Sequence, residues 1–305
     1  MLKFFYPTAA LLFFMLTACS PSAQEEKSLD QLKADIEAEL AKTEGTFAVA
    51  FKSLQEPEEE LLINAKENFH AASTMKTPVL LEVYKQAEAG KFSLDDSLTV
   101  KNEFKSIVDS SLYSLNPEDD SYNLLYEQIG EQQSIGDLTY NMIIASSNLA
   151  TNIVIELVGA ENTTQSMREL GANDIQVLRG VEDSKAYRQG LSNTTTAYDL
   201  MLMFDAIAKG EAVSQEASEE MIDILLDQKF NKMIPAKLPE DVKVAHKTGW
   251  ITGVHHDSGI VFLPDGRKYV LVLLSKELSD EEAGVETLAT VSKMIYDYMQ
   301  QDDGN

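Results

Sequence analysis

The sequence predicts an α+β fold, in which an antiparallel sheet built from both ends of the chain carries flanking helices and an inserted all-helical lobe. Apolar or alternating runs with strand character lie near the two ends, at 46–54, 61–65, 242–250, 255–264 and 268–278. The long middle, residues 91–240, shows mostly helical spacing. Because helices separate the two groups of strands, we expect the strands to meet in one sheet, with a cleft beside the helical lobe.

The first residues are expected to lie outside this fold. Residues 1–18 combine a positive charge at Lys3 with an apolar stretch and small residues, which is typical of a secretory signal peptide. The tetrapeptide ending at Cys19 resembles a bacterial lipobox, at which the cysteine is acylated. Cys19 is the only cysteine in the 305 residues, so it cannot form an internal disulfide. We therefore expect an exported protein, lipid-anchored through Cys19 to the periplasm-facing envelope membrane.

Domain boundaries follow from composition. Residues 19–27 are polar and are expected to form a flexible tether. The remaining domain is predicted to span 28–303, with a sheet lobe of about 28–72 and 240–303 and a helical lobe of about 73–239. After the signal segment, the sequence contains no apolar run long enough to cross a bilayer.

The elements of this domain follow from periodicity and from terminating residues. Helical spacing with a cap or a glycine stop predicts helices at 28–42, 73–89, 138–159 in two parts, 161–170, 195–210, 214–228 and 280–300. Residues 173–194 show little periodicity and are expected to form a long loop. Gly253 and Gly266 mark the turns between the last strands.

The net charge of the chain limits the classes of molecule that it is expected to bind. Fifty acidic residues against 25 basic ones give a net charge of −25. The sequence holds no basic stripe to neutralise phosphates, which argues against nucleic acid as a partner. The acidic residues are spread over expected loops and helix starts, where they are solvated. Any positive group in a site would therefore stand in a negative background field.

The first candidate motif is the Ser73-Thr74-Met75-Lys76 run at the start of the predicted helix 73–89. Positions three apart lie on one helical face, so Ser73 and Lys76 are neighbours there. The helix start also offers free backbone N–H groups for a developing oxyanion. A desolvated lysine can lose its proton and then accept one from the hydroxyl. On its own, the pattern equally describes a helix cap with a surface lysine.

A second polar run, Ser146-Ser147-Asn148, interrupts two apolar helical stretches. Serine and asparagine often break helices through local hydrogen bonds, so a simple turn is one reading. The other is a turn that points a hydroxyl and a carboxamide into the cleft.

A third run, Lys247-Thr248-Gly249, lies on a predicted strand and precedes Trp250. Glycine on a strand allows another backbone to approach closely. Lysine and threonine there can hold a substrate carboxylate. Alone, this tripeptide is common and carries little weight.

Together the three runs resemble the S-x-x-K, S-D-N and K-T-G pattern of the penicillin-recognising serine enzymes. In the order of its elements, the chain resembles a class A β-lactamase-like serine hydrolase over roughly residues 28–300. The resemblance implies the β-lactamase/transpeptidase-like α+β fold and an acyl-enzyme mechanism on a β-lactam or a peptidoglycan-like substrate.

The resemblance also implies roles for matching residues. Ser73 is the expected nucleophile, Lys76 its proton partner and Ser146 the relay toward the leaving nitrogen. Asn148 is expected to bind the substrate's side-chain amide, and Lys247, Thr248 and Gly249 to bind its carboxylate. The backbone N–H groups of Ser73 and Trp250 are expected to form the oxyanion hole.

Hydrolysis of the acyl-enzyme needs a general base. In the family this is a glutamate on the active-site loop, and Glu182 is the candidate here. Asp183 is a rival, and a surface acidic pair is the plain alternative. The resemblance implies no cofactor. The histidines at 70, 246, 255 and 256 lack ligand spacing, so we expect no metal site.

The chain departs from the family pattern at several places. Ser147 stands where the pattern has aspartate, Trp250 stands where a small residue is usual, and the loop lacks the asparagine that helps position water. The segment near 101–135 also looks long. These departures leave open a D,D-peptidase or esterase acting on cell-wall peptide, or a catalytically impaired envelope protein. We expect a monomer in every case.

Overall fold

The computed structural model describes residues 1–3 and 27–301. Most of the predicted signal segment, Cys19 and most of the tether lie outside the described residues. Among the residues described, no helix is both long and apolar enough to cross a membrane.

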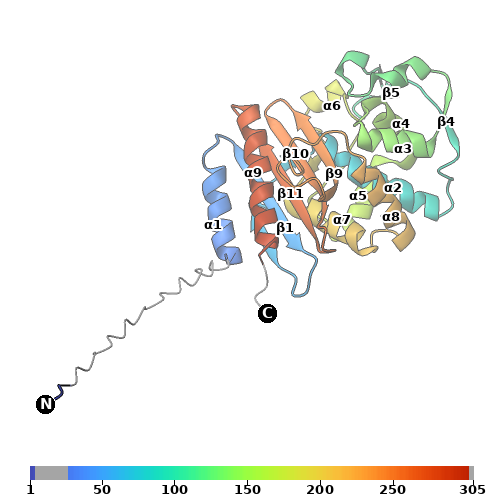
Figure 1. Cartoon of the computed structure of the whole chain (residues 1–305). Coiled ribbons are helices and arrows are strands. Elements are labelled where there is room, and N and C mark those ends of the chain that lie inside the picture. The colour runs from blue at the N-terminus through green and yellow to red at the C-terminus, as the bar shows by residue number, and fades with distance from the viewer. Residues whose placement is uncertain (4–26, 302–305) are drawn as a thin grey trace.

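The central sheet joins both ends of the chain, as predicted (Figure 1). All its neighbouring strands are antiparallel. In spatial order the strands are β2 (Glu60–Ile63), β1 (Thr46–Ser53), β11 (Lys268–Lys276), β10 (Val254–Phe262) and β9 (Lys243–Ile251). Strand β9, which carries the third motif, therefore forms one edge of the sheet.

Helices cover both faces of the sheet. One face carries the terminal helices α1 (Leu29–Leu40) and α9 (Glu281–Met299), which lie side by side in Figure 1. The helices on the other side are α2 (Lys76–Glu88), α3 (Ile135–Ile144), α4 (Asn148–Val158), α5 (Ala160–Glu169), α6 (Ser184–Arg188), α7 (Ala197–Lys209) and α8 (Gln215–Leu226). Helix α7 packs directly on β1, β10 and β11.

Alternation along β1 explains why both faces are buried. Ala48 and Ala50 join the core shared with the helical lobe, whereas Phe47, Val49 and Phe51 join the core under α1 and α9. Successive strand residues point to opposite faces, so a continuous apolar run suits a strand covered on both sides. The α+β prediction is confirmed.

The helical lobe contains more irregular structure than its spacing indicated. Short 3₁₀ helices occur at η1 (Ala72–Met75), η2 (Pro117–Asp119) and η3 (Asn123–Gln128). Short strand pairs form between β3 (Phe69–His70) and β8 (Thr194–Thr195), β4 (Ser97–Thr99) and β7 (Gln132–Ser134), and β5 (Phe104–Lys105) and β6 (Leu112–Tyr113). The expected long loop 173–194 contains helix α6, which begins at an Asp183 cap.

Candidate active site

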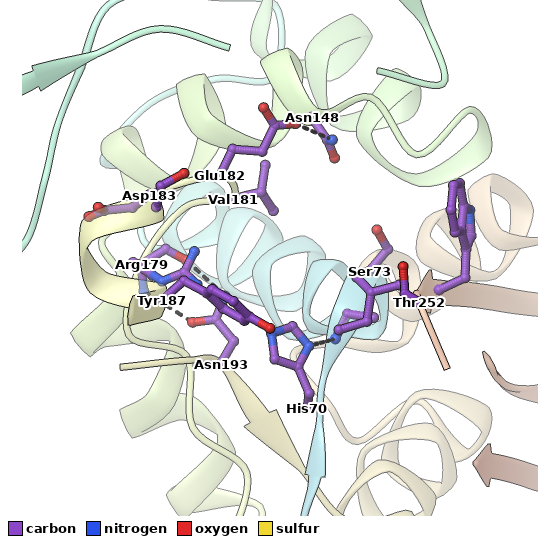
Figure 2. Close-up of a pocket in the computed structure, with 14 residues that line it drawn as sticks. His70, Ser73, Asn148, Arg179, Val181, Glu182, Asp183, Tyr187, Asn193 and Thr252 are labelled. Atoms are coloured by element: carbon purple, nitrogen blue, oxygen red, sulfur yellow. Dashed lines mark hydrogen bonds between the residues drawn. The ribbon is translucent and has the colours of Figure 1, made fainter. Parts of the chain in front are cut away.

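The nucleophile candidate sits on a tight turn and not on the helix itself. The expected helix 73–89 begins as the 3₁₀ turn η1, and α2 proper starts only at Lys76. Ala72 adopts a left-handed φ of 44°, and its N–H donates to Nδ1 of His70 over 3.0 Å (Figure 2). Such backbone strain persists only where the surroundings hold it. The turn leaves Ser73 partly exposed on the wall of a cavity.

A second histidine supports this turn from the sheet. Nε2 of His256 lies 2.9 Å from the carbonyl oxygen of His70, and its Nδ1 lies 2.9 Å from the carbonyl oxygen of His255 and 3.2 Å from the backbone nitrogen of Ser275. The contact with the His70 carbonyl oxygen requires a proton on Nε2, because a carbonyl oxygen only accepts hydrogen bonds. Burial lowers the pKa of His256 to about 4. Two neutral histidines therefore fasten the nucleophile turn to β10.

Acidification is expected to destabilise the fold through His256. The unfolded chain takes up a proton on this histidine below about pH 6.5, while the folded chain resists until about pH 4. The stabilising contribution is thus present above 6.5 and is lost as the pH falls, by up to about 3 kcal/mol. Thermal unfolding followed across this range checks it. His256→Gln, which does not titrate, should lose stability less steeply with acid; an equally steep loss would contradict the assignment.

Lys76 lies fully buried behind Ser73. Its Nζ donates to the carbonyl oxygen of Ser146 over 2.8 Å, to the hydroxyl of Ser146 over 3.1 Å, and to Oδ1 of Asn148 over 3.0 Å. Burial lowers the pKa of Lys76 to about 7, against the opposing negative charges of Asp120 and Glu182. A lysine with this pKa is neutral often enough at physiological pH to accept a proton.

A second buried lysine shares the same serine. Nζ of Lys247 donates to the Ser146 hydroxyl over 3.1 Å and to the carbonyl oxygen of Thr248 over 2.8 Å. Burial, and then the positive charge of Lys76, holds the pKa of Lys247 well below its ordinary value. The Ser146 oxygen thus accepts from both lysines, which leaves its own proton free to be donated elsewhere. Ser146 holds a left-handed φ of 54° at this turn.

Asn148 connects this cluster to the loop. Its Nδ2 donates to Oε1 of Glu182 over 2.8 Å, while its Oδ1 accepts from Lys76. Figure 2 shows the Glu182 side chain directed toward Asn148. Burial raises the pKa of Glu182, although the Asn148 hydrogen bond opposes the shift. A carboxylate with a raised pKa is a stronger base than an ordinary surface glutamate.

The rival carboxylate is occupied elsewhere. Oδ1 of Asp183 accepts from the Ser106 hydroxyl over 2.9 Å and from the N–H of Ala186 over 3.1 Å, and its Oδ2 accepts from the N–H of Ile107 over 2.9 Å. Burial by itself raises the pKa of Asp183, but these hydrogen bonds outweigh burial, so the pKa lies below its ordinary value. Asp183 therefore caps α6 and ties the loop to the β5–β6 hairpin.

The ends of the loop are fastened by two residues that the sequence did not single out. Nε of Arg179 donates to the carbonyl oxygen of Leu191 over 2.8 Å. Oδ1 of Asn193 accepts from the N–H of Leu178, and its Nδ2 donates to the carbonyl oxygen of Arg179. Hydrogen bonds between side chains and a distant backbone leave no spacing signal in a sequence, which is why these residues were missed.

Strand β9 brings the third motif against the nucleophile turn. A Cβ added to Gly249 would lie 2.8 Å from the backbone nitrogen of Ser73 and 2.9 Å from that of Thr74. Only glycine allows this approach. Thr248 is buried beside it, whereas Trp250 is 61% exposed at the cavity mouth.

Replacing Gly249 with alanine is expected to displace the nucleophile turn. The methyl group would meet backbone atoms, which cannot rotate away. Small displacements of a reacting group typically cost about 100-fold in rate, so we expect a loss of that order in β-lactam hydrolysis. Steady-state kinetics check this. Gly136→Ala on α3, where the nearest atom lies at 3.4 Å, is the control; equal rates in both variants would contradict the interpretation.

A cavity of about 340 Å³ opens in front of Ser73 (Figure 2). Of the predicted residues, Ser73, Asn148, Glu182, Asp183 and Trp250 line it, and Tyr187 and His70 form part of its wall. Lys76, Ser146 and Lys247 are buried and joined by the hydrogen bonds above. Within the described ranges, no three His, Asp or Glu side chains are placed to hold a metal ion.

Comparisons with known proteins agree with this arrangement. The model of the beta-lactamase enzyme family matches residues 31–299. The beta-lactamase VEB-1 of Pseudomonas aeruginosa is 23% identical, over 88% of this chain and 90% of that protein. The solved beta-lactamase of Sphaerobacter thermophilus is 25% identical, with a TM-score of 0.76 over 90% of this chain and 99% of its own.

Another solved structure is also similar. A PBP-A variant, solved as an acyl-enzyme complex with penicillin G, is 27% identical, with a TM-score of 0.76 over 90% of this chain and 98% of that one. The family match covers nearly the whole described domain, from α1 to the end of α9. The chain therefore belongs to the beta-lactamase enzyme family.

Proposed function

We propose that this protein is a serine β-lactamase that opens its substrate through an acyl-enzyme on Ser73. The observation that carries the proposal is the hydrogen-bonded chain from Lys76 through Asn148 to Glu182. These hydrogen bonds support the proposal, because Lys76 directly follows the nucleophile turn and Glu182 lines the cavity in front of it. The two steps of hydrolysis, acylation and deacylation, each have a base of their own.

In the acylation step, neutral Lys76 takes the proton from the Ser73 hydroxyl, and the oxygen attacks the lactam carbonyl carbon. The backbone N–H groups of Ser73 and Trp250 stabilise the oxyanion that forms. The C–N bond then breaks, and the Ser146 hydroxyl passes its proton to the leaving nitrogen while the Lys76 ammonium returns a proton to Ser146. Ser146 is suited to this because its oxygen accepts from both lysines. Lys247 and Thr248 bind the substrate carboxylate.

In the deacylation step, Glu182 takes a proton from a water molecule, whose oxygen attacks the ester carbonyl carbon. The ester C–O bond breaks and the proton returns to Ser73. The raised pKa of Glu182, caused by burial, favours this role. Asp183 is unsuited, because its oxygens are taken up by Ser106, Ile107 and Ala186. Asn148, besides orienting Glu182, is placed to contact the substrate's side-chain amide.

Intact-mass measurement after exposure to penicillin G, followed over time, tests the function. We expect a penicilloyl adduct on Ser73 that appears and then decays as hydrolysed product accumulates. A stable adduct with no turnover would identify a D,D-peptidase-like enzyme. No adduct and no turnover would identify a catalytically impaired envelope protein and overturn the proposal.

We also propose that the mature protein acts as a lipid-anchored monomer on β-lactams that reach the envelope. The sequence around Cys19 supports the anchor. Mass spectrometry of the N-terminal peptide from membranes should find an acylated Cys19, and Cys19→Ala should release the protein from the membrane. Sedimentation of the solubilised protein as a dimer would contradict the monomer.

A further inference from the structure

The start of α4 determines where two active-site side chains lie. Ser146 and Asn148 flank its N-cap, Ser147, and both bind Lys76. The first turn of a helix has backbone N–H groups without intrahelical partners. The buried Ser147 hydroxyl accepts from one of them, the N–H of Ala150, over 3.2 Å. The N–H of Leu149 needs another acceptor.

That acceptor is Asp120, from the long segment between the first two motifs. Its Oδ2 accepts from the N–H of Leu149 over 2.9 Å and from the Tyr126 hydroxyl over 3.0 Å. Its Oδ1 accepts from the N–H of Tyr122 over 3.0 Å. Asp120 is only 9% exposed. A negative charge at a helix N-terminus is also favoured by the helix dipole.

Position 147 explains why this carboxylate matters. The family pattern has aspartate there, and an aspartate at an N-cap can accept from the second or third N–H of the helix. In α4 these are the N–H groups of Leu149 and Ala150. The Ser147 hydroxyl accepts from the N–H of Ala150, and the Asp120 carboxylate accepts from the N–H of Leu149. The carboxylate that the motif lacks is thus present at the same helix start, delivered from another part of the chain.

The same carboxylate affects the charge balance around Lys76. The three acceptors that Lys76 contacts are uncharged oxygens, and a second lysine shares one of them. Asp120 and Glu182 supply the nearby negative charge that keeps the pKa of Lys76 from falling below about 7. Burial and Asp120 raise the pKa of Tyr126, so its hydroxyl remains protonated and continues to donate to Asp120.

We propose that Asp120 is a positioning residue for acylation. It holds the start of α4 in the position from which Ser146 and Asn148 accept hydrogen bonds from Lys76, and so replaces the carboxylate that is missing at position 147. The proposal rests on the proposed function, because acylation of Ser73 is the event it would slow.

The test compares Asp120→Ala with Asp119→Ala. Asp119 is the adjacent residue, but it is exposed and accepts a hydrogen bond from Asn116 instead of from α4. The acylation rate constant for penicillin G, measured by quenched-flow intact mass, should fall about 10- to 100-fold in Asp120→Ala. It should be unchanged in Asp119→Ala. The double variant Asp120→Ala, Ser147→Asp returns a carboxylate to the helix start and should regain most of the rate.

The pH dependence of the acylation rate distinguishes two roles of Asp120. In one, Asp120 positions α4 and its charge acts on Lys76; in the other, it only supports the structure. Asp120→Asn keeps an oxygen for Leu149 and removes the charge, so the pKa of Lys76 should fall. The acid limb of the acylation rate should therefore move to lower pH. Because this variant is nearly isosteric, it decides the question if Asp120→Ala does not fold.

Each opposing outcome is distinct. Asp120→Ala acylating as fast as Asp119→Ala would overturn the proposal, as would a double variant no faster than Asp120→Ala, or an unmoved acid limb in Asp120→Asn. In these cases wild type still acylates, and the proposed function stands. Wild type that never acylates would remove the proposed function together with this role for Asp120.

Discussion

Replacing Ser73 with alanine is expected to lower β-lactam hydrolysis by about 10⁵-fold or more, since removing a serine nucleophile abolishes the covalent route. The rest of the site should persist, because Ser73 faces the cavity while Lys76 keeps its bonds to Ser146 and Asn148. Nitrocefin and penicillin G hydrolysis measure the loss, and intact mass should find no adduct.

A matched serine is available for comparison. Ser184 also lines the cavity, but it lies on α6 away from the lysine cluster. Ser184→Ala should keep its activity and its adduct. Equal thermal midpoints for both variants would show that the loss in Ser73→Ala is chemical. Residual adduct in Ser73→Ala would mean that another residue is the nucleophile.

The second large effect is expected at Glu182. Glu182→Gln keeps an oxygen that can accept from Asn148 Nδ2, but it cannot take a proton from water. Loss of a general base usually costs about 10²- to 10⁴-fold, so deacylation should slow by that order. Acylation should continue, because Lys76 is its base. The penicilloyl adduct should therefore accumulate, which time-resolved intact mass reports directly.

The rival carboxylate provides the contrast. Asp183→Asn loses part of the hydrogen bonding to Ser106, Ile107 and Ala186, so its thermal midpoint should fall while its adduct still decays. An adduct that decays normally in Glu182→Gln and persists in Asp183→Asn would reverse the assignment. A Glu182→Gln variant that is never acylated would place Glu182 in the first step as well.

The division between the two carboxylates shows where sequence reasoning ends. Both are acidic, adjacent and on the same loop, and no periodicity tells them apart. The structure separates them because Glu182 adopts a left-handed φ of 62°, and its side chain reaches Asn148. The next residue begins α6 as its cap. Both residues line the cavity, but tertiary contacts bind the Glu182 carboxylate to Asn148 and the Asp183 carboxylate to the β5–β6 hairpin.

The nucleophile turn shows the same limit in a different way. Helical spacing placed Ser73 on a regular helix, whereas the chain forms a 3₁₀ turn first. The cause lies outside the segment: His70 holds the N–H of Ala72, and Gly249 presses against the turn from β9. Helical spacing reports neither contact, because one joins a side chain to the backbone two residues on and the other comes from a distant strand.

The sequence by itself determined the α+β architecture and the three motifs, because strand alternation, helical spacing and short motifs are local patterns. Apolar runs such as β1 had to be covered on both faces, and this placed helices on either side of the sheet. Only the tertiary structure decided which carboxylate binds Asn148, how the nucleophile turn is held, and that Asp120 reaches the start of α4. These contacts join distant segments, and their free energy depends on burial and on hydrogen-bond geometry, which arise only once the chain has folded.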